Sequence, residues 1–113
     1  MECNPNITEL YIIDVSNTEI SISQIYSLIE DYNYVLGGNK KLHKFIDLLF
    51  TKYNANLFDW IKENPYSSIG NNIVFLESFR LEKESWIDIR KIAHSFGLIV
   101  FDDINRLIYK PEI

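Results

Sequence analysis

The spacing of hydrophobic and polar positions predicts helices in the first half of the chain, after one early strand. Glu9–Val15 is short, β-branched and aromatic, which is typical of a strand. Ser21 and Gln24 have the spacing of a capping box, in which each side chain bonds the other residue's backbone N–H. Hydrophobic residues follow at helical intervals, so we expect a first helix running to about Asn33.

A second helix is predicted after Gly37 and Gly38. Asn39 is placed to cap it, and hydrophobic residues recur with helical period from Leu42 to Tyr53. Beyond it we expect a short helical turn over Leu57–Lys62 and a buried strand over Ile73–Leu76.

The C-terminal third predicts a helix followed by a hairpin. Ser85 and Asp88 again have capping spacing, and Gly97 suits the left-handed residue that closes a helix. Two hydrophobic strands then flank a loop rich in Asp and Asn, a composition typical of tight turns: 98–101 and 106–109 around 102–105.

The resulting order is β-α-α-(short α)-β-α-β-β, which predicts an α/β (α+β) fold. We expect a small mixed four-stranded sheet with helices mainly on one face. The helix between the second and third strands favours a parallel direction for that pair, adjacent or not. The last two strands should be antiparallel. A chain of 113 residues is the size of a single domain, 1–113.

Composition limits the compartment and the class of partner. Cys3 is the only cysteine, so neither an internal disulfide nor a Cys-based zinc site is expected. The N-terminus lacks the pattern of a signal peptide, and no apolar run approaches the ~20 residues that span a bilayer. We therefore expect a cytoplasmic protein. A net charge of −5 argues against nucleic acid or an anionic membrane as partner, and is compatible with a basic protein.

The order of the charges is uneven along the chain. Residues 1–39 hold six acids and no Lys or Arg, whereas residues 40–52 hold four lysines and one aspartate. Two acids end the first helix and three lysines begin the second, in each case against the helix dipole: Glu30, Asp31, Lys40, Lys41 and Lys44. Two explanations are open, a functional surface or pairing between these groups if the second helix folds back on the first. Three further acids have no base nearby in sequence, which favours a surface: Glu9, Asp14 and Glu19.

Residues for catalysis are few. His43 lies among lysines, so we expect a solvated or half-buried surface histidine. His94 falls in the last turn of the third helix, where a cation complements the dipole, so a structural role is expected for it. Asp102 and Asp103, with Asn105, could bind a hard cation, but such residues more often close a turn through their own backbone. We predict no catalytic, metal-binding or cofactor-binding residue and no small-molecule substrate.

The segment Ile92–Asp103, with Leu107 and Pro111, resembles the C-terminal part of small bacterial immunity proteins. The shared features are an alanine on a helix, Gly-Leu, an apolar strand with an aromatic residue before Asp, a turn, and a short strand closed by Pro. Such proteins are encoded beside polymorphic toxins, including those of contact-dependent growth inhibition systems. The chain departs from the pattern after Asp102, and no binding residue is carried over by the resemblance.

The first hypothesis is an immunity protein that covers the active site or substrate groove of a basic toxin domain. Six residues are candidates for contacting this partner: Glu19, Glu30, Asp31, Tyr34, Asp102 and Asp103. The alternatives are an adaptor domain that binds another cytoplasmic protein, and a small metal-dependent hydrolase that uses Asp102 and Asp103.

Overall fold

The computed structural model describes residues 7–16, 19–31, 39–53, 59–60, 69–79 and 83–111. The helices in this part of the chain are α1 (Ile22–Glu30), α2 (Lys40–Tyr53) and α3 (Lys83–Ser95). The strands are β1 (Ile7–Ile13), β2 (Asp59–Trp60), β3 (Ile73–Phe79), β4 (Ile99–Asp102) and β5 (Leu107–Tyr109). The predicted α+β class is confirmed.

The strands form one sheet in the order β2-β3-β1-β4-β5. Each neighbouring pair is antiparallel. Because β3 and β4 are both antiparallel to β1, they run in the same direction, as predicted for strands connected through a helix. They are separated by β1, so the described ladders are antiparallel where a mixed sheet was expected. The last two strands pair antiparallel, also as predicted.

One predicted element has a different structure. The helical turn expected over Leu57–Lys62 is wrong at Asp59–Trp60, which is extended and pairs with Phe79–Ser78 of β3. Edge pairing supplies backbone hydrogen bonds that a short isolated helical turn lacks. The other residues of that segment lie outside the described ranges.

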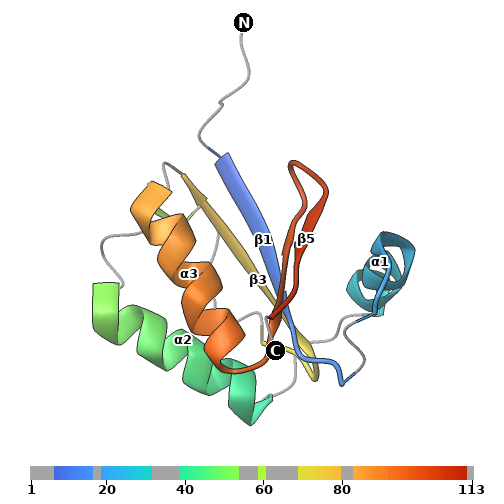
Figure 1. Cartoon of the computed structure of the whole chain (residues 1–113), viewed down its shortest axis with the longest axis horizontal. Coiled ribbons are helices and arrows are strands. Elements are labelled where there is room, and N and C mark those ends of the chain that lie inside the picture. The colour runs from blue at the N-terminus through green and yellow to red at the C-terminus, as the bar shows by residue number, and fades with distance from the viewer. Residues whose placement is uncertain are drawn as a thin grey trace, which may run out of the picture.

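The two faces of the sheet are covered by different helices (Figure 1). Side chains alternate along β1, so Leu10 and Ile12 pack in the core shared with α2 and α3, while Ile13 and Tyr11 pack in the core shared with α1. The expectation of helices mainly on one face therefore holds for α2 and α3. The shorter α1 lies on the opposite face.

The burial of each helix follows its hydrophobic spacing. In α2 four residues are fully buried against the sheet: Leu42, Phe45, Ile46 and Leu49. In α1 full burial is confined to Ile25, with neighbours that are partly buried. The α1 helix thus rests on the sheet with much of its surface open to solvent.

Helix ends agree with the predicted caps at α1. Ser21 Oγ accepts a hydrogen bond from the Gln24 N–H at 3.3 Å, and Gln24 Oε1 accepts one from the Ser21 N–H at 2.8 Å. The helix ends at Glu30 with Asp31 as its C-cap, earlier than predicted. Asn33 lies outside the described residues.

At α3 one predicted cap is wrong and the other is confirmed. The helix begins at Lys83, so Ser85 lies within it and is not the cap. Lysine and glutamate at positions 83 and 84 are good helix formers and extend it toward the N-terminus. Gly97 has φ +74°, and the N–H groups of Gly97 and Leu98 donate to the carbonyls of His94 and Ala93. This pair of bonds closes the helix as expected for a glycine there.

Candidate functional site

Opposite charges lie on opposite sides of the sheet. The segment 19–31, which contains α1, carries three acids and no Lys or Arg. On the other face, α2 carries four lysines against one aspartate, and α3 carries three bases against two acids. The uneven charge order of the sequence thus becomes a separation of charge in space.

Three of the predicted partner-binding acids belong to the α1 segment and are exposed: Glu19, Glu30 and Asp31. Glu19 precedes the N-cap, while Glu30 and Asp31 lie at the C-terminal end of the helix. A nine-residue helix is about 14 Å long, so the acids flank α1 at both ends. Tyr34, the predicted aromatic anchor, lies outside the described residues.

Internal pairing between these acids and the α2 lysines does not occur. The helices lie on opposite faces of the sheet (Figure 1), and among the described residues no ion pair joins Glu30 or Asp31 to an α2 lysine. Of the two explanations left open by the sequence, the folding of the second helix back onto the first is wrong.

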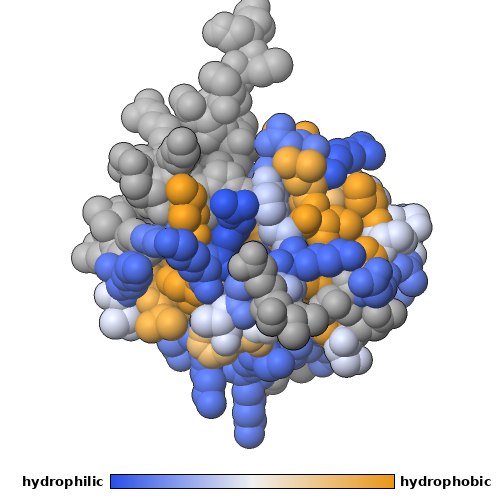
Figure 2. All heavy atoms as spheres, in the orientation of Figure 1, coloured by the Kyte–Doolittle hydropathy of each residue, from blue (hydrophilic) through white to orange (hydrophobic). Residues whose placement is uncertain are grey.

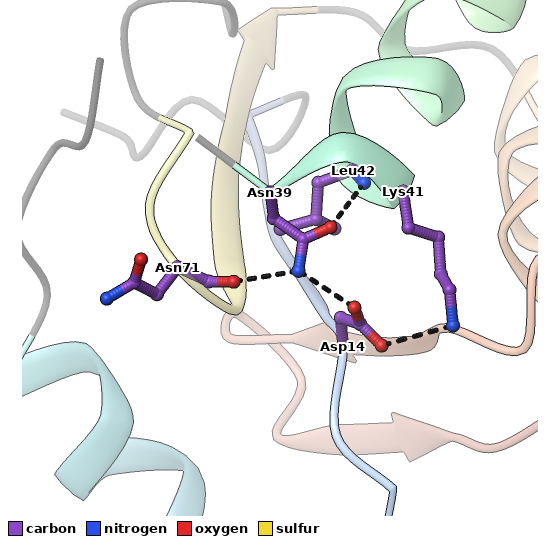
Figure 3. Close-up of polar contacts among 5 residues, drawn as sticks. All are labelled: Asp14, Asn39, Lys41, Leu42 and Asn71. Carbon is purple, nitrogen blue, oxygen red and sulfur yellow. Dashed lines mark hydrogen bonds and ion pairs between the residues drawn. The ribbon is translucent and has the colours of Figure 1, made fainter. Parts of the chain in front are cut away.

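Lys41 instead pairs with Asp14, at the end of β1 (Figure 3). The distance between Lys41 Nζ and Asp14 Oδ1 is 3.4 Å. The Asn39 side-chain amide donates to Asp14 Oδ2 at 2.8 Å and to the Asn71 carbonyl at 2.7 Å, and its Oδ1 accepts the Leu42 N–H at 3.0 Å. Asn39 caps α2 as predicted. Asp14, which has no base nearby in sequence, thus has a partner in the fold, and its carboxylate joins α2 to the sheet.

Asp102 is buried and serves the hairpin turn. It is 4% exposed, and its carboxylate accepts hydrogen bonds from the Ile104 N–H (3.0 Å), the Asn105 N–H (3.2 Å) and the Asn105 side-chain amide (2.9 Å). Arg106 completes the turn with φ 58°. The turn-closing role weighed for this residue is confirmed. Its proposed contact with a partner is not supported, because these bonds and burial occupy the carboxylate.

Asp103, in contrast, points toward α1. The Tyr26 hydroxyl donates to Asp103 Oδ1 at 2.6 Å, and the Arg106 guanidinium lies 5.6 Å from the centre of the Tyr26 ring. The hydrogen bond to Asp103 raises the pKa of Tyr26, with further contributions from desolvation and from the Asp103 charge, while Arg106 lowers it. Tyr26 thus couples α1 to the β4–β5 turn.

Aromatic rings of the sheet pack against Tyr26 and against each other on the face covered by α1. The Tyr26 ring meets Phe101 edge-on at 5.7 Å, and Tyr11 stacks on Phe75 at 4.7 Å in the neighbouring strands. Glu30 lies one helical turn after Tyr26, and residues four apart on a helix are neighbours. The acids at the end of α1 and Asp103 therefore share one side of the molecule.

We define the α1 surface as the exposed acids of the α1 segment together with the Tyr26–Asp103 pair: Glu19, Tyr26, Glu30, Asp31 and Asp103. Ile104, next to Asp103, is 52% exposed, and Leu107 at the start of β5 is 47% exposed. Figure 2 shows hydrophobic side chains gathered over the β4–β5 hairpin on the side toward α1, with hydrophilic ones around them. Sequence reasoning missed Tyr26, since its bond to Asp103 spans 77 positions and leaves no local signal.

The described ranges contain no group of three or more His, Cys, Asp or Glu side chains able to hold a metal ion. His43 Nδ1 lies 3.2 Å from Asp47 Oδ2 on α2 and its side chain is exposed, as expected for a surface histidine, and His94 lies in the last turn of α3, where it was predicted. None of the described helices has the length and hydrophobicity that crossing a membrane requires.

No protein-family model, no curated protein and no solved structure matches the chain.

Proposed function

We propose that the chain is an immunity protein that binds a cognate secreted toxin domain in the cytoplasm and covers its active site or substrate groove. Two independent lines support this. The C-terminal segment 92–111 resembles immunity proteins in sequence. The α1 surface has the charge and the mixture of acidic, aromatic and apolar groups that suit a protein partner.

The observation that carries the proposal is the separation of charge across the sheet. The acids of the α1 segment are exposed and lie away from the lysines of α2. Had the two helices packed together, opposite charges would have neutralised each other. The fold instead places these acids and Asp103 on one side, where Arg106 over the Tyr26 ring offsets part of their charge, and the remaining negative charge complements a basic cleft.

The chemistry of the partner follows from that complementarity. A toxin that cleaves RNA or DNA needs a basic cleft for phosphates, and an acidic protein can occupy the cleft in place of the nucleic acid. Opposite potentials steer the encounter and raise the association rate. Occlusion requires no reactive group on the inhibitor, so contact and charge are sufficient for neutralisation.

The C-terminal end of α1 is the part most directly involved. The carboxylates of Glu30 and Asp31 lie where the helix dipole is already negative, and no basic residue occupies the last turn. Both effects make this end of the helix strongly negative. A lysine or arginine of the toxin cleft would be attracted both by these exposed carboxylates and by the negative end of the helix dipole.

The test is a double charge reversal, E30K with D31K. The affinity of this variant is measured for the toxin domain encoded by the adjacent gene, once that domain has been shown to co-purify with the chain. We expect at least a tenfold loss of affinity (about 1.4 kcal/mol or more) and loss of toxin neutralisation. The melting temperature should stay nearly unchanged or rise slightly, because both side chains are exposed and lysines at the C-terminal end of a helix complement its dipole.

The matched control is D47K, which reverses an exposed acid on α2, on the other face of the sheet. It should leave the affinity for the toxin domain within about twofold of the wild type, because the effect of a charge far from the interface is screened at physiological salt. Unchanged affinity of the double reversal, or an equal loss in D47K, would reject the α1 surface. A neighbouring gene product whose activity the chain does not reduce would reject the immunity function itself.

A further inference from the structure

A second surface, which is basic where the α1 surface is acidic, lies between α3 and β5. It is an open groove with a volume of about 390 Å³. Its lining is made of two apolar, one aromatic and four basic or imidazole side chains: Ile87, Ile108, Tyr109, Arg90, Lys91, His94 and Lys110. No acid is among these described lining residues. In a chain with net charge −5, such a groove is a local concentration of positive charge.

Tyr109 holds two of these groups in place. The Arg90 guanidinium carbon lies 4.5 Å from the centre of the Tyr109 ring, a cation–π arrangement. His94 Nε2 lies 3.3 Å from the Tyr109 carbonyl oxygen. Because residues 90 and 94 are one helical turn apart, both point from the same stripe of α3 toward β5. The groove therefore has an ordered wall.

The two lysines complete its rim. Lys91 and Lys110 are exposed, and neither forms an ion pair with another described residue. Their ammonium groups are able to turn toward an anion above the Tyr109 wall. The groove thus combines a guanidinium, an imidazole and two mobile cations.

We propose that this groove binds the phosphoryl group of a small ligand. A phosphoryl dianion offers three acceptor oxygens and about two charges, and thus satisfies several convergent donors, whereas one carboxylate satisfies fewer. Guanidinium groups match phosphate oxygens in a planar fork, and lysines add point charges. The side chains of Ile87 and Tyr109 provide an apolar wall for the rest of the ligand. The volume is near the lower end of small-molecule sites, roughly 300–1,000 Å³.

This inference does not depend on the immunity function, because the groove and the α1 surface share no residue. The net charge of the chain is negative, but the basic lining of the groove makes anion binding favourable at this one place. A soluble phosphorylated molecule and a phospholipid headgroup carry the same phosphoryl chemistry, so the experiment separates these two sources.

The test is an NMR titration of the isotopically labelled full chain with inorganic phosphate and with adenosine monophosphate, at constant ionic strength. We expect saturable shifts confined to residues 87–94 and 108–110. Replacing both rim lysines, K91Q with K110Q, should weaken binding at least tenfold, while leaving the spectrum of the folded chain intact. The matched control K40Q with K44Q removes two exposed lysines that do not line the groove and should weaken binding less than threefold.

The outcomes divide cleanly. Saturable binding of adenosine monophosphate supports a soluble ligand, whereas binding to phosphatidic acid vesicles without it supports a lipid headgroup in the same site. Shifts that acetate or chloride reproduce at equal ionic strength would overturn the proposal. So would wild-type affinity in the K91Q/K110Q variant.

Discussion

At the scale of single residues, Tyr26 shows how one hydroxyl connects distant parts of the chain. Its hydrogen bond to Asp103 fixes α1 against the β4–β5 turn. Asp103 was a candidate as one of two neighbouring acids in the predicted loop 102–105, and sequence alone could not separate it from Asp102. Asp102 is buried and closes the turn, whereas Asp103 bonds Tyr26, because successive side chains along a strand point to opposite faces of the sheet.

The Tyr26–Asp103 bond predicts an unusual titration. The pKa of Tyr26 should lie above the ordinary value of 10.0, because ionisation would break a hydrogen bond and place two negative charges together. The D103N substitution keeps an acceptor oxygen but removes the negative charge beside the Tyr26 hydroxyl. The pKa of Tyr26 should therefore fall toward the ordinary value. Carbon-13 NMR of the tyrosine rings measures both. A Tyr26 that titrates with the exposed tyrosines in the wild type would contradict the bond.

Stability should follow the same titration. Because the folded protein binds this proton more tightly than the unfolded chain, the stabilisation is fully present below pH 10 and is lost as the pH rises through the raised pKa. The difference in unfolding midpoint between the wild type and Y26F should therefore shrink in this alkaline range.

Asn39 has a comparable structural role, and the sequence predicted only half of it. Its cap of α2 is a local pattern, whereas its amide bonds to Asp14 and Asn71 arise from the fold. We expect N39A to lower the free energy of unfolding by about 0.5–2 kcal/mol, the range measured for lost caps. Urea denaturation measures the change.

Two variants separate the roles of Asn39. N39S retains a cap oxygen without the amide donors and should lose less than N39A. K41Q removes an exposed ion pair at 3.4 Å and should cost less than about 1 kcal/mol. A stability of N39A equal to that of the wild type would show that the cluster in Figure 3 contributes little.

At the scale of elements, local patterns predicted the helices well and their placement poorly. The caps at Ser21, Asn39 and Gly97 are encoded within a few residues, so they were found. The side of the sheet on which α1 packs depends on how the whole chain crosses β1. Two hydrophobic helices in succession fit either arrangement, and only packing decides. The short strand β2 likewise exists because β3 offers it an edge.

Gly97 tests the closure of α3 most simply. With φ +74° it occupies a region that costs other residues about 1–2 kcal/mol, and an added Cβ would meet no atom within 4 Å. G97A should therefore lose about that amount in urea denaturation, through backbone strain without a clash. G97N should lose less, because asparagine tolerates this conformation. An unchanged or raised stability in G97A would contradict the assigned geometry.

At the scale of the whole molecule, the sheet acts as a partition between charges. The acidic N-terminal segment and the lysine-rich segment after it were visible in sequence, but either pairing or separation was compatible with them. Separation follows from the three-layer arrangement, with α1 on one face and α2 and α3 on the other (Figure 1). Of the predicted site residues, Glu19, Glu30, Asp31 and Asp103 lie on this acidic side, and Asp102 is used by the fold.

The central claim is that a partner docks on the α1 surface. Hydrogen–deuterium exchange of the chain, alone and mixed with the product of the adjacent gene proposed as its toxin partner, tests it most directly. We expect slower exchange on binding across residues 19–31 and 102–106, with α2 unchanged. Protection confined to α2 and α3, with α1 exchanging as in the isolated chain, would contradict it.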